Sequence, residues 1–190
     1  SAMVDNLTGL YAVIAILAAI EERHRTGLGQ HVEVSLMGSA LAGLLNVGSG
    51  HVVADVDPGR QGNRHPSIVP YQPYRTSDGV LAVAAASPAL WEKFCVVLGR
   101  DDWLADARFC DNGSRIRHAD ELEVQIESVL ATGTTEAWLE RLRAGGIPAG
   151  PINTVRDAFI DAAELGLDPV DVFDDGDGEV VQKLRLGREL

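Results

Sequence analysis

Cysteine, aromatic and basic residues are all scarce in this chain of 190 residues. The two cysteines, Cys95 and Cys110, cannot build a disulfide framework and do not form a Cys-x-x-Cys pair, so we expect buried or tolerated thiols in a reducing cytoplasm. Only 16 Lys and Arg stand against 28 Asp and Glu, which gives a net charge of −12. Such a charge argues against a nucleic acid or an anionic membrane surface as a partner.

The chain also lacks several signatures of membrane and metal proteins. Its longest apolar run, Leu10 to Ile20, is too short to span a bilayer, and no basic segment precedes it as in a signal peptide. No residue spacing matches a metal site, and the acidic stretch Asp174–Glu179 lacks the ligand spacing of an EF-hand. A solvated turn between short strands at 170–173 and 179–184 is expected there instead. We therefore predict no metal and no resident cofactor.

The most informative part of the sequence is its first thirty residues. A helix is predicted from about Leu7 to Arg25, apolar on all sides from Leu10 to Ile20, so both of its faces must be covered. Asp5 stands just before this helix, where unpaired backbone N–H groups carry partial positive charge. Two interpretations of Asp5 follow. It is a helix N-cap, or it is a carboxylate held in place as a nucleophile.

The segment after this helix is typical of the end of an α/β layer domain. His31–Ser35 alternates as a strand does, and the Ala- and Leu-rich stretch from Leu36 to about Val47 predicts a second helix. From Gly48 to Pro70 glycine and proline are frequent and no periodicity persists, which is typical of a linker or a functional loop. His65 in this stretch is more simply a loop-packing residue than a base.

The remainder predicts a compact α+β module. Two strands, 71–76 and 80–85, flank a Ser-Asp-Gly turn and predict a hairpin. Ser87-Pro88 opens a helix that ends before Gly99, and further helices are expected at 119–130, 134–144 and 155–164, with an extended segment at 147–152. One face of the 88–98 helix carries a predicted core stripe: Trp91, Phe94, Cys95 and Leu98.

Several of these segments together resemble family III CoA transferases, the CaiB/BaiF group. In chain order the resemblance is carried by Asp5-x-x-Thr8-Gly9-Leu10-Tyr11-Ala12, Ile16–Ala19, Arg23-x-Arg25-Thr26-Gly27-x-Gly29-Gln30, Val32–Leu36, Gly62-Asn63-x-His65-Pro66, Pro70-Tyr71, Trp91, Asn112 and Ile147–Pro151. Each fragment is weak alone, but their order and spacing extend over nearly the whole chain.

The resemblance implies a particular α/β architecture. Residues 1–50 would be the C-terminal part of a Rossmann-like, CoA-binding large domain whose strands lie upstream of Ser1. Residues 51–70 would form a linker with a glycine-containing loop, and residues 71–165 the small α+β domain. Residues 166–190 would return to the large domain. Two chains of the family interlock as linked rings, so a homodimer is expected.

The resemblance also implies a reaction. CoA would pass from an acyl-CoA thioester to a small carboxylic acid through an anhydride and then a CoA thioester on Asp5. Backbone groups at Gly59, Gly62 and Asn63 are assigned to the developing oxyanion. CoA is then a substrate, not a cofactor. Two alternatives stay open: an acyl-CoA racemase of the same superfamily, with an aspartate acting as acid and base, and an assembly or domain fragment without activity of its own.

Overall fold

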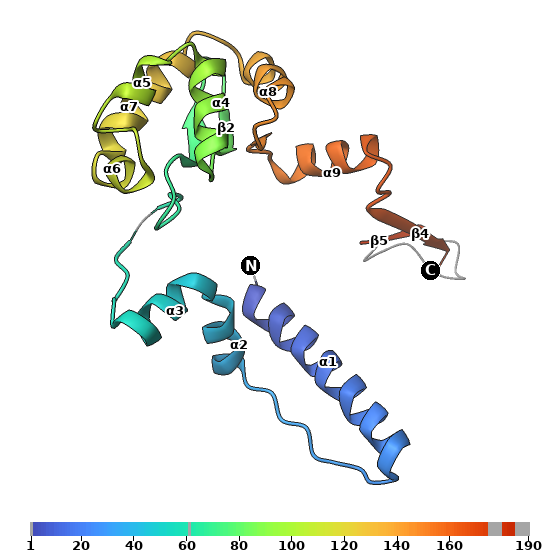
Figure 1. Ribbon diagram of the computed structural model, residues 1–190. Helices are drawn as coiled ribbons and strands as arrows, with labels where there is room; N and C mark the ends of the chain where they lie inside the picture. The colour runs from blue at the N-terminus through green and yellow to red at the C-terminus, as the bar shows by residue number, and fades with distance from the viewer. Residues whose placement is uncertain (1, 61, 175–179, 185–190) are drawn as a thin grey trace. The chain divides into compact units, whose positions relative to one another are not determined.

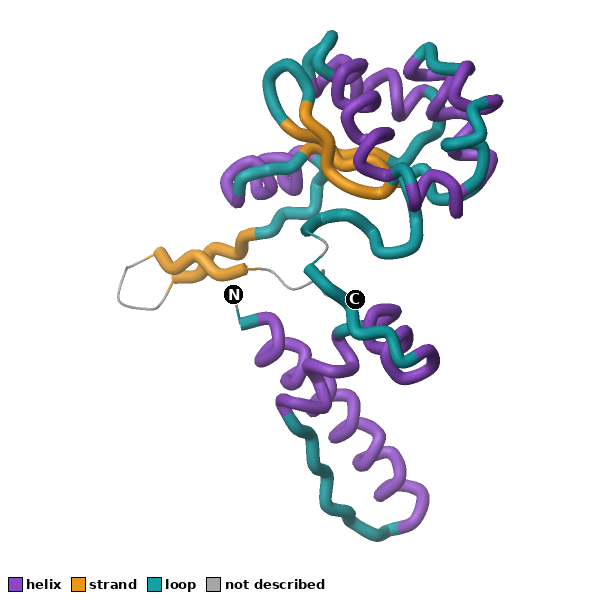
Figure 2. Tube along the Cα trace, turned by 90° about the vertical axis from the view of Figure 1, so that its left-hand side faces the viewer, coloured by secondary structure: helices purple, strands orange, loops and turns teal. Residues whose placement is uncertain are grey.

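The computed structural model describes residues 2–60, 62–174 and 180–184, and the chain divides into two units, Ser1–Gly62 and Asn63–Leu190 (Figures 1 and 2). Each unit is described by itself. Both are rich in helix, and strands form only small antiparallel sheets. The mixed helix and sheet content agrees with the predicted α/β class at this coarse level.

The first unit is built on α1, Met3–Thr26. It ends as predicted at Gly27, whose φ of 74° is left-handed and whose N–H donates to the Arg23 carbonyl. Its start is earlier than predicted, because Met3 and Val4 already have helical backbone and Ala2 occupies the N-cap position. Asp5 therefore lies inside the first turn, and the N-cap interpretation of Asp5 is wrong.

One narrow stripe of α1 is half-buried, and no residue of the helix is fully buried. The stripe follows helical spacing through Thr8, Ala12, Ala15 and Ala19. Small side chains on this stripe allow close packing, while the large apolar residues point outward: Leu10, Val13, Ile14, Ile16, Leu17 and Ile20 are 40–62% exposed. The helix is thus covered on one side only within its own unit.

The structure also corrects the length argument against a membrane span. Because α1 extends beyond the apolar run at both ends, its 24 residues are long and apolar enough to cross a bilayer by length and composition, with a mean hydropathy of 1.8 in its best window. Core helices of water-soluble proteins meet the same criterion. The length of this helix therefore decides nothing about a membrane.

Two further predictions for the first unit are wrong. Residues 31–35 are not a strand, because the alternating pattern finds no strand partner among the described residues. The second helix breaks into α2, Leu36–Gly43, and α3, Leu45–Ala54, where Leu45 takes a positive φ of 51°. α3 continues through Gly48 to Ala54, so the first third of the expected loop is helical.

The second unit contains a three-stranded antiparallel sheet in the order β1-β2-β3. β1, Tyr71–Arg75, and β2, Val80–Ala84, form the predicted hairpin, with Tyr74 opposite Leu81. β3, Ala149–Pro151, is the extended segment expected near Pro148, and it pairs with the other edge of β2. The hairpin prediction and the extended segment are both confirmed.

Helices follow β2 before β3 closes the sheet (Figure 1). Ser87 caps α4, Pro88–Leu98, by accepting from the Leu90 N–H, and Thr134 caps α8, Thr135–Ala144, in the same way, as predicted. The other helices are α5 Asp102–Ala105, α6 Asn112–Arg117, α7 Ala119–Leu130 and α9 Val155–Glu164. The short helices α5 and α6 were not predicted, because four to six residues are too few to show a helical period.

The core of the second unit lies where α4, α7 and α8 meet the sheet. The predicted stripe on α4 is confirmed, since Trp91, Phe94, Cys95 and Leu98 are all buried. Leu122, Ile126 and Leu130 of α7 and Trp138, Leu139 and Leu142 of α8 complete it.

After α9 the chain forms a two-stranded sheet of β4, Val170–Asp174, and β5, Val180–Leu184. The paired strands were predicted almost at these bounds, whereas the acidic turn at 175–179 lies outside the described residues. The division into four segments that the family resemblance implies stays a prediction.

Candidate active site

Asp5 is the third residue of α1 and is exposed. Within the described residues, no hydrogen bond or ion pair is formed by its carboxylate. The nearby Thr8 hydroxyl donates to the Val4 carbonyl at 2.7 Å and not to the Asp5 carboxylate. A carboxylate in the first turn lies near the partial positive charge of the helix N-terminus, which stabilises the helix. The Asp5 side chain is therefore unpaired in the described part of the chain and open to solvent.

The three predicted loop residues lie where the two units meet in the sequence. Gly59 and Gly62 are exposed at the end of the first unit, and Asn63 begins the second. Gly62 has a φ of 62°, a left-handed conformation that a glycine adopts without strain. Gln61 lies outside the described residues. The structure brings neither Gly59 nor Gly62 into a hydrogen bond with Asp5 in the described part of the first unit, and the oxyanion role stays a prediction.

The segment that follows, Arg64–Tyr71, is fixed to the second unit; we call it the anchored segment. The Arg64 guanidinium donates to Gln72 Oε1 at 3.0 Å, forms an ion pair with Asp120 at 2.8 Å and binds the Glu123 carboxylate. No local pattern predicted these contacts, because the partners of Arg64 are eight to nearly sixty residues away.

His65 packs within the anchored segment, as predicted. Its ring stacks on Tyr71 with the centroids 5.0 Å apart, and its backbone N–H donates to the Tyr71 carbonyl. Its Nδ1 accepts from the Ser67 N–H at 3.2 Å. The Gly-Asn-x-His-Pro and Pro-Tyr fragments of the family resemblance thus meet in one compact turn.

Asn112 and Arg115 of α6 hold the end of this segment. Asn112 Oδ1 accepts from the Val69 N–H at 3.1 Å, and its Nδ2 donates to the Ser67 carbonyl at 2.9 Å. Arg115 donates from Nε to the Val69 carbonyl at 2.6 Å and from Nη1 to the Phe109 carbonyl at 3.0 Å. Both backbone groups of buried Val69 are therefore satisfied by side chains of α6.

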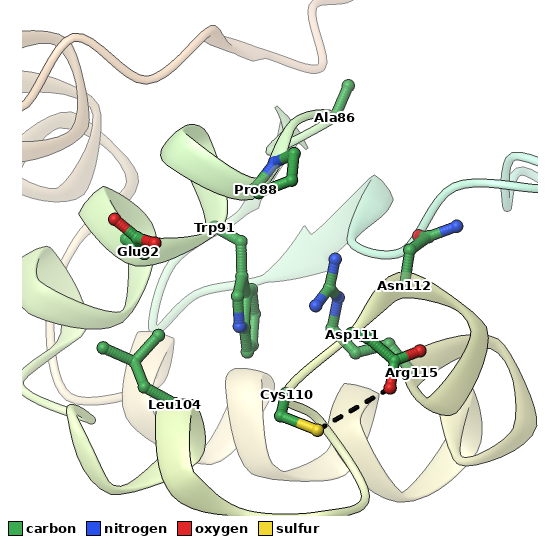
Figure 3. Close-up of a pocket in the computed structure, with 9 residues that line it drawn as sticks. All are labelled: Ala86, Pro88, Trp91, Glu92, Leu104, Cys110, Asp111, Asn112 and Arg115. Carbon is green, nitrogen blue, oxygen red and sulfur yellow. Dashed lines mark hydrogen bonds between the residues drawn. The ribbon is translucent and has the colours of Figure 1, made fainter.

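Arg115 also borders a cavity of about 290 Å³ in the second unit (Figure 3). Its guanidinium carbon lies 4.5 Å from the centre of the Trp91 ring, and the Trp91 ring also stacks on Trp103. Burial lowers the pKa of Arg115, since the group is only 4% exposed and has no carboxylate within ion-pair distance among the described residues. The indole Nε1 of Trp91 has no hydrogen-bond acceptor in the described part of the protein.

This cavity does not have the charge of an anion site. Two carboxylates, Glu92 and Asp111, line it together with the single arginine, so its lining has no net positive charge. Asp111 is held by the Ser114 N–H and hydroxyl, and Cys110 beside it is exposed (Figure 3). We therefore assign Arg115 to holding Val69, not to binding CoA phosphates.

A second cavity of about 290 Å³ lies in the first unit between the latter half of α1 and residues 29–32. Its lining is mostly apolar, with Arg23 as its one charged residue: Ile16, Ala19, Ile20, Arg23, Gly29, Gln30 and Val32. Among the described residues no group of three or more His, Cys, Asp or Glu is placed to hold a metal ion. Buried Cys95 is poorly suited to nucleophilic chemistry, because burial raises its pKa to about 12.

The comparison with protein families decides what this arrangement belongs to. The family model for CoA-transferase family III matches residues 1–187. The chain belongs to CoA-transferase family III. The match covers both units, so Asp5, the anchored segment and α6 are all parts of one family III framework.

Individual family III relatives agree with this assignment. The chain is 34% identical over 164 residues to succinyl-CoA:glutarate CoA-transferase of Mus musculus, a match that covers 86% of this chain and 38% of the relative. The solved structure of Rv3272 from M. tuberculosis superposes with a TM-score of 0.84 at 26% identity, over 99% of this chain and 49% of that one. A CAIB/BAIF family protein from Brucella suis gives a TM-score of 0.72 at 31% identity, over 100% and 53%.

This family III chain spans about two fifths of the length of the mouse relative and about half of each solved chain. The CaiB/BaiF resemblance is therefore confirmed, together with the expectation that the sequence corresponds to part of a family member. Among the residues that hold the anchored segment, only Asn112 was singled out from the sequence, as an isolated match to the family. Arg64 and Arg115 were missed, because nothing in the neighbouring sequence distinguishes them from the other arginines of the chain.

Proposed function

We propose that this chain supplies the aspartyl nucleophile of a CoA transferase that moves CoA from an acyl-CoA thioester to a small carboxylic acid. The family III match across both units is the observation that carries the proposal. The mouse relative is named for succinyl-CoA and glutarate, so a dicarboxylic acid is the first acceptor class to test.

In the proposed reaction, an oxygen of the Asp5 carboxylate attacks the thioester carbonyl of the donor. The C–S bond breaks, CoA leaves as a thiolate, and an acyl-aspartyl anhydride is formed. The thiolate then attacks the Asp5 carbonyl of the anhydride, which releases the donor acid and leaves CoA as a thioester on Asp5. Covalent catalysis of this kind divides one difficult transfer into easier steps.

The second half of the reaction repeats these steps with the acceptor. Its carboxylate attacks the aspartyl-CoA thioester and forms a new anhydride, and the released thiolate attacks the acceptor's carbonyl. This yields the new acyl-CoA and restores the Asp5 carboxylate. Each attack places negative charge on a carbonyl oxygen, and we assign the backbone N–H groups at Gly59, Gly62 and Asn63 to stabilise it.

Binding CoA requires more than the described residues offer. Neither cavity presents a cluster of basic residues, and the large apolar side chains of α1 lie open to solvent. We propose that a Rossmann-like part covers α1 and binds CoA. It would correspond to the portion of the family members that this chain does not span. We further propose that the assembled enzyme is a cytoplasmic homodimer. The chain by itself is then expected to show no turnover.

Mass spectrometry of the full-length enzyme tests the role of Asp5. Incubation with succinyl-CoA should leave a CoA or acyl adduct on the peptide that contains Asp5, and hydroxylamine should remove it. Asp5→Asn should abolish both the adduct and transfer to glutarate, because an amide oxygen is not a competent nucleophile. Glu21→Gln, the matched loss of an exposed carboxylate on the same helix, should change neither.

The same variants separate chemistry from folding. Because Asp5 is not the N-cap, Asp5→Ala should lower the free energy of unfolding only by the helix-dipole contribution, about 0.3–1 kcal/mol. Normal transfer by Asp5→Asn would refute the assignment. Activity lost in Asp5→Asn without any adduct in the parent enzyme would favour acid-base chemistry at the α-carbon, as in a racemase.

A further inference from the structure

The anchored segment is held to the second unit by three side chains: its own Arg64, and Asn112 and Arg115 of α6. Arg64 reaches α7 and β1, while Asn112 and Arg115 reach back from α6. Apart from the bond between Arg64 and Gln72, these contacts join residues 43 to 59 positions apart in the sequence. A simple linker between two units does not require so many hydrogen bonds to residues far away in the sequence.

The α6 contacts replace the pairing that a strand would provide. Val69 is 3% exposed and donates its N–H to Asn112 while its carbonyl accepts from Arg115. Ser67 two residues earlier accepts from the same Asn112 amide. A side-chain amide that donates and accepts in this way fixes the backbone in both translation and rotation. The Arg64 network adds a charge-assisted contact at the other end of the turn.

The consequence concerns the two residues immediately before Arg64. Gly62 and Asn63 make no described side-chain contact that would fix them, so the position of their backbone N–H groups depends on the segment to which they are joined. An oxyanion donor must be held to within a fraction of an ångström of its productive position, and a misplacement of about 1 Å can cost about 100-fold in rate.

We propose that Arg64, Asn112 and Arg115 are positioning residues that fix the N–H groups of Gly62 and Asn63 for acyl transfer. The inference rests on the proposed function for its kinetic part. Its structural part, the anchoring of residues 64–71, stands on the contacts alone. Arg115 borders the cavity beside Trp91 (Figure 3). Its guanidinium donates there to the Val69 and Phe109 carbonyls and lies over the indole ring.

Amide hydrogen exchange on this chain tests the anchoring. In Asn112→Ala the exchange of the Val69 amide should rise at least about tenfold, because its one acceptor is lost. Asn112→Asp keeps an acceptor for Val69 and should restore most of the protection. The matched control is Asn153→Ala, which removes an exposed amide bonded to Asp161 elsewhere in the same unit. Unchanged exchange at Val69 in Asn112→Ala would overturn the anchoring.

Steady-state kinetics of the full-length enzyme, with succinyl-CoA and glutarate as probes, test the positioning. Arg64→Gln and Asn112→Ala should lower kcat about tenfold or more while both KM values stay within about twofold, and Arg64→Lys should recover part of the loss. Arg108→Gln is the matched control, because Arg108 pairs with Asp106 and with Glu121 on α7 without touching the segment.

The outcomes separate the two proposals. Raised exchange with an unchanged kcat would overturn positioning and leave the transferase intact. A parent enzyme that forms no Asp5 adduct would overturn the proposed function and the kinetic part of the inference, whereas the exchange result would still decide the anchoring. Arg115 is not substituted, because its burial in the core would make a loss of folding indistinguishable from a loss of position.

Discussion

The three tryptophans of the second unit form a matched set that measures the cost of one unpaired N–H group. Trp91, Trp103 and Trp138 are 2%, 0% and 3% exposed, and each has an arginine guanidinium 4.1–4.5 Å from its ring centre. Trp103 Nε1 donates to Gln125 at 2.9 Å and Trp138 Nε1 to the Leu130 carbonyl at 2.8 Å. Only Trp91 lacks an acceptor within the described residues.

Replacing each tryptophan by phenylalanine removes the same atoms but different hydrogen bonds. Trp103→Phe and Trp138→Phe each lose one hydrogen bond, a net loss of about 0.5–1.5 kcal/mol beyond the lost ring contacts. Each acceptor keeps a second donor, because Arg100 also donates to Gln125 Oε1 and the Gly133 N–H also donates to the Leu130 carbonyl. Trp91→Phe loses no such hydrogen bond, and it removes a buried donor whose missing partner already costs about 1–3 kcal/mol. We therefore expect Trp91→Phe to be less destabilising than the other two by at least about 1.5 kcal/mol.

Urea unfolding followed by far-ultraviolet circular dichroism measures this difference. With a slope of about 2 kcal/mol per molar urea, the midpoint of Trp91→Phe should lie at least about 0.7 M above the midpoints of the other two variants. The slope should be the same in all three, since the exposed surface is nearly unchanged. If Trp91→Phe loses as much stability as Trp138→Phe, the Trp91 N–H has a partner in solution and the reasoning fails.

Two further predictions concern titration and thiol chemistry. Hydrogen bonds from the Arg108 side chain and backbone hold the pKa of Asp106 at about 2, so its contribution to stability is complete above about pH 4 and is lost as the pH falls toward 2. Melting temperatures should therefore separate Asp106→Asn from the parent at pH 5 and converge near pH 2; a constant gap would contradict this origin. In the native chain at pH 8, iodoacetamide should modify exposed Cys110 and leave buried Cys95 unreacted, and equal modification of both in intact-mass and peptide spectra would contradict the described core.

Local signals in the sequence were sufficient for much of the second unit. Ser87-Pro88 with Gly99, and Thr134 before an apolar period, define helix ends through hydrogen bonds within four residues, so these helices were predicted almost to the residue. The hairpin at Ser77–Gly79 is equally local. Such features do not depend on what the rest of the chain does.

In the first unit, local sequence signals were not sufficient to predict the structure. The alternation at 31–35 is a real strand pattern, but a strand exists only with a partner, and no described residue provides one. The glycines at 48 and 50 suggested a loop, yet both lie in α3. The start of α1 was placed too late because Met3 and Val4 stand on the far side of Asp5, which looked like a cap.

The candidate site was only partly predictable for the same reason. Asp5 was selected through the family resemblance, since its residue type and place near a helix start fit a cap equally well. The anchored segment joins Arg64 to Asp120 and Val69 to Arg115, and these contacts are invisible in a pattern that is read along the chain. Asn112 entered as an isolated match, and the structure supplies its physical role.

The order of strands in the three-stranded sheet determines when that sheet can be completed. β1 and β2 are joined by a short turn, but β3 lies beyond α8, and Leu81 pairs with Pro151. A growing chain that has not yet extended to Ala149 therefore carries β2 with one edge unpaired, and such edges invite pairing with other chains. The helices α4 to α8 must find their places while that edge is open. The last strand of this small sheet thus closes a segment of about seventy residues, which gives the second unit a higher contact order than its helical content suggests.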